Sequence, residues 1–212
     1  MNIFIISCRI LIFSAVFLAG CAFHPTTQPT EKWNQPCEKC TAGVSSCDKC
    51  ILGVGNFAKV TPKLWRGAQP TEEGFRNLEK AGVKTVISLR DEHDDFDNFS
   101  QLGGAKTLKY IRIPMHAWNP DKAQLIVLMN VLERALEDPK SYPVFIHCAA
   151  GKDRTGYSVA TYRMVSQEPH WSADNAILEM YDFGFNEIWF RNPDFLKSLD
   201  TGNFNALKKL AP

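Results

Sequence analysis

The chain has 212 residues, of which 45% are hydrophobic and 22% charged, and its formal net charge is +1. This length suits one domain with short appendages, and the hydrophobic fraction excludes a chain that is disordered throughout. A charge so close to zero argues against a nucleic-acid partner bound through a large basic surface. Six of the seven cysteines lie in the first fifty residues, whereas Cys148 stands alone, so the chain joins two kinds of sequence.

The first twenty residues have the pattern of a secretory signal. Arg9 precedes the apolar run ILIFSAVFLA at 10–19, which as a helix would cover about 15 Å, half the hydrocarbon thickness of a membrane. A signal peptide at 1–20 fits this length better than a membrane span. The residues LAGC at 18–21 resemble the lipobox of bacterial lipoproteins. The resemblance implies that Cys21 is acylated, that residues 1–20 are removed, and that the protein is exported and lipid-anchored in the bacterial cell envelope, facing the periplasm in a Gram-negative cell. An uncleaved membrane anchor is the alternative.

The next segment, residues 21–54, lacks an apolar period and predicts an extended tether between the membrane and the folded part. Two C-x-x-C pairs lie in it, formed by Cys37, Cys40, Cys47 and Cys50. An oxidising, exported setting favours two disulfides among these thiols. A zinc site is the weaker alternative, because zinc sites of this kind usually separate the pairs by about 15–20 residues. A redox-active pair would need a surrounding βαβ pattern, which the segment lacks.

From residue 55 to residue 212 the sequence alternates between the periods of strands and helices. Thr71 is placed to N-cap a helix whose first turn carries Glu72 and Glu73, and Gly82 is placed to end it. The expected strands are at 64–66, 83–89, 108–114 and 144–147, and the expected helices are at 71–81, 121–136, 156–167 and 172–180, with one or two covering helices after them. This alternation predicts an α/β fold, in which one domain has a largely parallel central sheet with helices on both faces.

The chemistry concentrates between the last expected strand and the helix after it, in the loop HCAAGKDRTG at 147–156. At a strand–loop–helix junction of small residues, successive backbone N–H groups can surround an anion at the helix N-terminus. Cys148 would face those amides as a thiolate and could attack phosphorus. Arg154 can bind two phosphoryl oxygens, and Thr155 can donate its hydroxyl to the leaving sulfur. A purely structural cysteine would explain Cys148, but neither Arg154 nor Gly151.

This loop closely resembles the phosphate-binding loop of the cysteine-dependent protein tyrosine and dual-specificity phosphatases. LWRGAQPTEEGFRNLEKAGVKTVISLR at 64–90 also resembles the opening of compact bacterial members of that superfamily. The resemblance implies a phosphatase domain at 55–212 that hydrolyses phosphate monoesters through a phosphocysteine intermediate on Cys148, without a metal or another cofactor. It implies that these loop residues bind the phosphate: Ala149, Ala150, Gly151, Lys152, Asp153, Arg154 and Thr155.

The substrate implied by the resemblance is a phosphorylated protein or a small phosphorylated molecule. Protein phosphotyrosine is favoured, and a phosphoinositide or an inositol phosphate is the alternative. Lys152 would add a second positive charge beside the phosphate, which suits a polyanionic substrate, or it would simply be an exposed loop lysine.

The general acid that protonates the leaving oxygen is the least defined part of the expected site. Asp121 ranks first, because Trp118-Asn119-Pro120-Asp121 is comparable to a Trp-Pro-Asp loop with one residue inserted, although Asp121 is equally well placed to N-cap a helix. Asp153 ranks second and His116 third. The acidic stretch 91–97 is a further source, but its simplest interpretation is a solvated loop.

Two other classes of function stay open. A phosphatase-like domain that only binds phosphorylated ligands would account for the poorly defined acid, but it would not need the nucleophile Cys148. A thiol-redox or metal protein would instead use the four cysteines between residues 37 and 50. Deleting residues 22–53 distinguishes these classes, because phosphatase activity should survive if Cys148 is the reactive centre.

Overall fold

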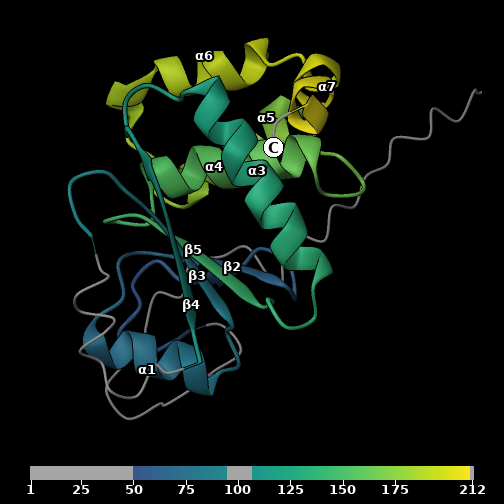
Figure 1. Ribbon diagram of the computed structural model, residues 1–212. Coiled ribbons are helices and arrows are strands. Elements are labelled where there is room, and N and C mark those ends of the chain that lie inside the picture. Colours follow the sequence, from purple (N-terminus) through teal and green to yellow (C-terminus); the bar gives the residue numbers. More distant parts are fainter. Residues whose placement is uncertain (1–49, 95–106, 211–212) are drawn as a thin grey trace, which may run out of the picture.

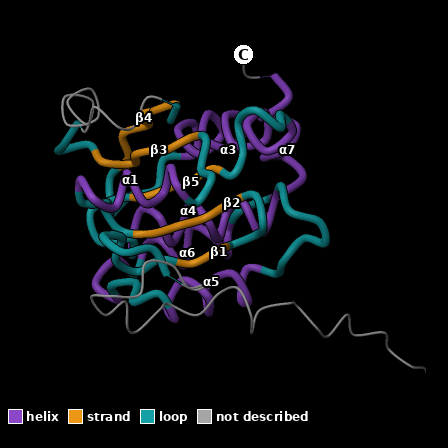
Figure 2. Tube along the Cα trace, turned by 90° about the horizontal axis from the view of Figure 1, so that it is seen from below, coloured by secondary structure: helices purple, strands orange, loops and turns teal. Residues whose placement is uncertain are grey.

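Five strands form one sheet in the order β1-β2-β5-β3-β4 (Figures 1 and 2). The computed structural model describes residues 50–94 and 107–210. The strands are β1 Ala58–Lys59, β2 Leu64–Gly67, β3 Thr85–Arg90, β4 Lys109–Met115 and β5 Val144–His147. Within these residues β1 pairs antiparallel with β2, and every other neighbouring pair is parallel. The prediction of a largely parallel sheet is therefore confirmed.

Strand β5 lies at the centre of the sheet between β2 and β3 and is buried along its whole length. Its short run of apolar residues suits a strand that is covered on both faces, as central parallel strands are. His147, the last residue of β5, pairs with Gly67 of β2 and Ser88 of β3. The carboxyl ends of three neighbouring parallel strands thus meet at one edge of the sheet, where the loop after β5 begins.

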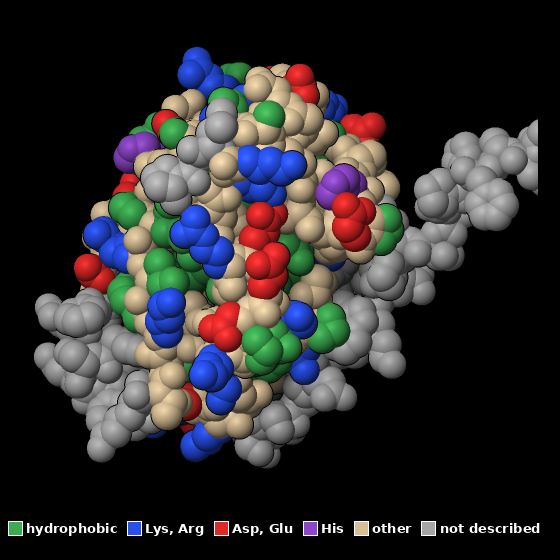
Figure 3. Space-filling view, turned by 45° about the vertical axis from the view of Figure 1, so that its right-hand side comes forward, with side chains coloured by type: hydrophobic (Ala, Val, Ile, Leu, Met, Phe, Trp, Pro, Cys, Tyr) green, Lys and Arg blue, Asp and Glu red, His purple; other side chains and the backbone are tan. Residues whose placement is uncertain are grey.

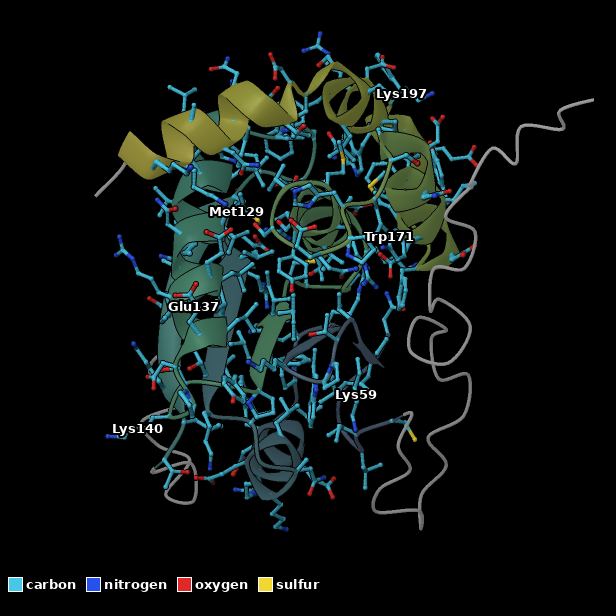
Figure 4. All side chains as sticks on the ribbon, turned by 90° about the vertical axis from the view of Figure 1, so that its right-hand side faces the viewer. Lys59, Met129, Glu137, Lys140, Trp171 and Lys197 are labelled. Carbon is cyan, nitrogen blue, oxygen red and sulfur yellow. The ribbon has the colours of Figure 1, made fainter. Side chains whose placement is uncertain are left out.

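Helices cover both faces of the sheet, as the sequence predicts. Figure 1 shows α1 on one face and the other labelled helices on the opposite face, and Figure 4 shows α3, α4 and α5 side by side from another direction. The helices are α1 Glu72–Lys80, α3 Lys122–Glu137, α4 Asp153–Val165, α5 Ala173–Asp182, the 3-10 helix η1 Glu187–Trp189, α6 Arg191–Ser198 and α7 Thr201–Leu210. Each face of the sheet has its own cluster of buried apolar side chains, and the larger cluster lies under α3–α7.

The local signals at the beginnings and ends of the helices act as expected. Thr71 accepts a hydrogen bond from Gly74 N, and Gly82 follows α1 with a φ of +98°, the left-handed conformation that glycine adopts without strain. Ser172 caps α5 in the same way as Thr71 caps α1. Helix α4, however, begins at Asp153 rather than at residue 156. Arg154 and Thr155 therefore belong to its first turn, where a helix presents free N–H groups.

The folded part begins earlier than the sequence analysis expects. Cys50, Ile51 and Val54 are buried, and the last two are 4% and 5% exposed in the core on the α1 side of the sheet. Gly53 O accepts a hydrogen bond from Thr71 N at 2.9 Å. The assignment of residues 50–54 to an extended tether was wrong, because two apolar side chains in a glycine-containing turn are too few to show a period.

The remaining N-terminal predictions lie outside the described residues: the signal peptide at 1–20, the acylation of Cys21, and the pairing of Cys37, Cys40 and Cys47 with each other or with Cys50. In the described ranges no helix is long and apolar enough to cross a membrane. The same ranges contain no group of three or more metal-binding side chains. On the face drawn in Figure 3, Lys and Arg side chains are interspersed with Asp and Glu, so this face is not uniformly basic.

Candidate active site

At the turn of the loop after β5, glycine is the only residue type that fits at position 151. Gly151 has a φ of +68°. A Cβ atom at this position would lie 2.5 Å from Gly67 C and 2.6 Å from Ala68 N, which is closer than any real contact. The loop therefore rests directly on the backbone at the end of β2, and a side chain at residue 151 would push it away.

Side chains and backbone groups from neighbouring segments hold the carbonyl groups of this loop. Asn56 Nδ2 donates to Gly151 O and to Phe183 O, each at 3.0 Å, and Gln69 N donates to Ala149 O at 3.1 Å. Because its carbonyl groups are bound to these segments, the loop has a defined shape. Its amide N–H groups, at the N-terminus of α4, are left to bind an anion.

Cys148 lies at the start of this loop and is only 3% exposed. Arg154 and Thr155, which are expected to act with Cys148, lie in the first turn of α4. The hydroxyl oxygen of Thr155 is buried and has no hydrogen-bond partner within the described residues. Arg154 is charged at any physiological pH and interacts electrostatically with Cys148.

Two carboxylates hold the guanidinium of Arg154. Its Nη1 donates to Asp91 Oδ1 at 2.6 Å and to Glu92 Oε2 at 2.5 Å, and its Nη2 donates to Glu92 Oε1 at 3.0 Å. Burial alone would lower the pKa of Arg154, but its hydrogen bonds with Glu92 and the negative charges of Cys148, Glu92 and Asp91 raise it. The hydrogen bond from Arg154 in turn lowers the pKa of Glu92. Asp91 and Glu92 lie in a loop, as predicted, and the Glu92 side chain is 45% exposed. The loop interpretation did not include their contacts with Arg154, which lies 63 and 62 residues away in the sequence.

These contacts leave one edge of the guanidinium for a ligand. A guanidinium has five N–H groups, and Asp91 and Glu92 use both N–H groups of Nη1 and one of Nη2. The Nε–H and the second Nη2–H of Arg154 lie on adjacent positions of the same planar fork, which matches two phosphoryl oxygens. The two carboxylates thus orient Arg154 without occupying its whole binding edge.

The sequence analysis missed Arg66, the third residue of β2. This side chain is fully buried, and its Nη2 donates to Gly151 O at 2.7 Å while its guanidinium lies 3.8 Å from the ring centroid of Phe183. Desolvation lowers the pKa of Arg66 to about 10, against the opposing charges of Glu179 and Cys148. The only signal in the sequence was a charged residue within a strand that is otherwise apolar.

His147, which precedes the nucleophile, is fully buried, and its ring stacks on that of Phe145 with the ring centroids 5.7 Å apart. Desolvation lowers the pKa of His147 to about 3, so the imidazole is neutral at pH 7. A neutral ring here adds no charge beside Cys148.

Lys152 and the three candidate acids lie in different surroundings. Lys152 is exposed, and its Cε would lie 3.2 Å from a Cβ atom built at Gly184, so its chain crosses the turn after α5. Asp121 Oδ1 accepts from Gln124 N at 2.9 Å as the N-cap of α3, and Asp153 Oδ1 accepts from Asn186 N at 2.9 Å. His116 Nδ1 lies 2.7 Å from Asp91 Oδ2.

Comparisons with known proteins show that the chain is similar to phosphatases. Residues 55–192 match the model of the family described as "DSP-PTPase phosphatase fused to NAD+ Kinase". The chain is similar to the dual specificity protein phosphatase TpbA of Pseudomonas aeruginosa, with 32% identity over 132 residues, which are 62% of this chain and 56% of TpbA. It is also similar to the inositol diphosphatase SIW14 of Saccharomyces cerevisiae, with 26% identity over 168 residues, which are 74% of this chain and 54% of SIW14. The chain thus spans little more than half the length of these two curated relatives.

A solved structure agrees with the fold. The crystal structure of P. aeruginosa TpbA superposes with a TM-score of 0.64 at 26% sequence identity, covering 80% of this chain and 99% of that one. A cysteine-to-serine form of TpbA in complex with phosphotyrosine superposes with a TM-score of 0.61, also at 26% identity, covering 74% of this chain and 91% of that one.

Proposed function

The chain belongs to the family described as "DSP-PTPase phosphatase fused to NAD+ Kinase", whose model matches residues 55–192. From this premise we propose that the chain hydrolyses phosphate monoesters through a phosphocysteine intermediate on Cys148. One observation carries the proposal. A single strand–loop–helix junction combines a buried thiol at Cys148, a guanidinium with a free binding edge at Arg154, and a Thr155 hydroxyl that has no partner in the described part of the chain. A cysteine that served only for packing would require neither the guanidinium of Arg154 nor the hydroxyl of Thr155.

The reaction follows from these groups in two steps. The Cys148 thiolate attacks phosphorus, so that the S–P bond forms while the bond from phosphorus to the leaving oxygen breaks and its electron pair goes to that oxygen. Arg154 and the loop amides bind the phosphoryl oxygens as charge develops on them. Water then attacks the phosphocysteine, and the sulfur leaves as a thiolate that the Thr155 hydroxyl stabilises with a hydrogen bond.

We favour protein phosphotyrosine as the substrate. The support is the similarity to TpbA, which is named a dual specificity protein phosphatase and whose structure is known with phosphotyrosine. An inositol phosphate or a phosphoinositide is the second candidate, supported by the similarity to SIW14, which is named an inositol diphosphatase. The exposed Lys152 is available to a second phosphate, but it lies against Gly184 rather than against the loop amides.

Membrane attachment is a further part of the proposal. Its support is the sequence alone, namely the apolar run at 10–19 followed by LAGC at 18–21. We propose that Cys21 is acylated and that the phosphatase domain faces the exported side of a bacterial membrane. A tether of residues 22–49 would then separate the domain from the lipid surface.

The decisive experiment compares wild type with Cys148→Ser on a panel of phosphotyrosyl peptides, inositol phosphates and aryl phosphates. The substitution should abolish phosphate release, with a loss of at least about 10³-fold, because a serine hydroxyl at neutral pH is a far weaker nucleophile than a thiolate. EDTA should leave the wild-type rate unchanged. The circular dichroism spectrum of the variant should match that of wild type.

Three outcomes would contradict the proposal. Full activity of Cys148→Ser would place the reaction elsewhere, and sensitivity to EDTA would indicate a metal-dependent reaction. Binding of phosphorylated ligands without turnover of any substrate would favour a module that only binds phosphate. The order of kcat/KM across the panel decides between phosphotyrosine and inositol phosphates.

A further inference from the structure

The proposed reaction needs a proton for the leaving oxygen, and the two aspartates that ranked first as its source already have structural contacts. Asp121 Oδ1 accepts from Gln124 N and caps α3, while Asp153 Oδ1 accepts from Asn186 N and ties the start of α4 to the turn before η1. Among the described residues, the carboxylates that bind Arg154 are those of Asp91 and Glu92. Asp121 and Asp153 are each explained by the backbone amide that they bind.

His116 is connected to the phosphate-binding group through one carboxylate. Asp91 Oδ2 lies 2.7 Å from His116 Nδ1, and Asp91 Oδ1 accepts from Arg154 Nη1 at 2.6 Å. The backbone of His116 is attached as well, because the Tyr157 hydroxyl of α4 donates to His116 O at 2.9 Å. One turn of α4 therefore fixes both the guanidinium that binds phosphate and the segment that carries the imidazole.

The orientation of the His116 ring is set on two sides. Asp91 accepts the Nδ1–H, and the Trp118 ring stacks against the imidazole with centroids 5.0 Å apart and planes inclined by 23°. Asn192 Nδ2 holds the loop by donating to Ala117 O at 2.8 Å. The His116 side chain is 53% exposed, so the contact with Asp91 through Nδ1 does not enclose the rest of the ring. A carboxylate on Nδ1 that leaves Nε2 available is the arrangement that prepares a histidine for proton transfer.

We infer that His116, oriented by Asp91, is the catalytic acid of the reaction proposed above. When the bond from phosphorus to the leaving oxygen breaks, its electron pair takes the proton of the imidazolium Nε2, and His116 becomes a neutral imidazole with its Nδ1–H still on Asp91. When water attacks the phosphocysteine, neutral Nε2 accepts one proton from that water. The imidazolium is restored, the sulfur leaves as a thiolate, and protons balance over the cycle.

Leaving-group dependence tests this role apart from the proposed function on which it rests. Phenyl phosphate has a leaving oxygen that must be protonated, whereas the leaving group of 2,4-dinitrophenyl phosphate departs as an anion without help. His116→Ala should lower kcat/KM, which reports only the steps up to cleavage of the leaving-group bond, by about 10²–10⁴-fold for phenyl phosphate. It should change kcat/KM for 2,4-dinitrophenyl phosphate by no more than about threefold, whereas hydrolysis of the shared phosphocysteine affects only kcat. Added imidazole should restore part of the lost phenyl phosphate turnover. The matched control is His170→Gln, since His170 is another exposed histidine, with its Nδ1 bound to Gln167 O, and it should leave both rates unchanged.

Each other outcome has a distinct meaning. An equal loss on both substrates, without rescue by imidazole, would overturn the inference and make His116 a residue that supports structure or binding. A loss confined to phenyl phosphate in Asp121→Asn or Asp153→Asn, with His116→Ala unaffected, would overturn it in favour of that aspartate. If wild type turned over neither substrate, the proposed function itself would fail. If wild type were active and His116→Ala were equally active on both substrates, only the role of His116 would fail.

Discussion

Arg66 has a buried positive charge that makes no ion pair among the described residues. Its Nε and Nη1 atoms also have no hydrogen-bond partner there, and burial lowers its pKa to about 10, so it stays protonated at pH 7. Of the opposing charges that it feels, Glu179 is already paired with Arg163 at 2.6 Å. The other is Cys148, so the charge of Arg66 should favour the thiolate and a bound phosphate.

We predict that Arg66→Met slows the alkylation of Cys148 by iodoacetamide at pH 7 by about tenfold, because it removes a positive charge that attracts the thiolate through a low-dielectric interior. Arg66→Lys should recover part of the rate, since it keeps the charge. Phe183→Leu is the control, because it removes the ring beneath Arg66 and leaves the charge. An equal slowing by Phe183→Leu and Arg66→Met would show that only packing matters.

At the scale of elements, the junction of β5 and α4 combines a buried strand end with a helix N-terminus, and this burial makes His147 sensitive to acid. In the folded chain desolvation lowers the pKa of His147 to about 3, whereas an unfolded histidine titrates near about 6.5. Between these values the unfolded chain binds a proton that the folded chain does not. The free energy of unfolding therefore increases with pH across this window and is lost as the pH falls through it.

We predict that, as the pH falls from about 6 to about 4, protonation of His147 in the unfolded chain lowers the free energy of unfolding by about 1.4 kcal/mol for each pH unit. His147→Phe, which keeps an aromatic ring beside Phe145, should reduce the pH dependence by this amount. Urea unfolding of both proteins at matched pH measures the difference and cancels the carboxylates that titrate in the same range. Parallel stability curves for the two proteins would rule out a buried, neutral His147.

For the whole molecule, the domain and its proposed anchor should act independently. Cys21→Ser should move the protein from the membrane fraction to the soluble fraction and leave kcat on a soluble aryl phosphate unchanged, because acylation supplies attachment and no catalytic group. Fractionation and activity assays on the same preparations measure this. Retention of Cys21→Ser in the membrane fraction would argue for an uncleaved anchor at 10–19.

Two truncations serve as controls on the domain boundary. A chain that begins at residue 50 should keep its activity and stability. A chain that begins at residue 55 should be destabilised by about 3 kcal/mol or more, since it lacks the buried side chains of Ile51 and Val54. Equal stability of the two chains would restore the boundary that the sequence predicts.

Most of the fold could be predicted from the sequence because its signals are local. The strand at 144–147 begins with three apolar residues and is buried throughout, as a strand covered on both faces must be. Thr71 and Ser172 begin helices, and Gly82 ends one, through groups only a few residues away. The loop from Cys148 to Thr155 could be recognised for the same reason, since its chemistry lies in eight consecutive residues.

The tertiary structure alone determined which charged groups meet around that loop. Arg154 contacts Asp91 across 63 residues, Asp91 contacts His116 across 25, and Arg66 contacts Gly151 across 85. No spacing in the sequence encodes these contacts, because they arise where the ends of parallel strands and the loops after them converge at one edge of the sheet. The sequence by itself thus identified the nucleophile and the phosphate-binding loop. Only the folded chain could supply the surrounding charges, because electrostatic interactions depend on distance in space and not on separation along the chain.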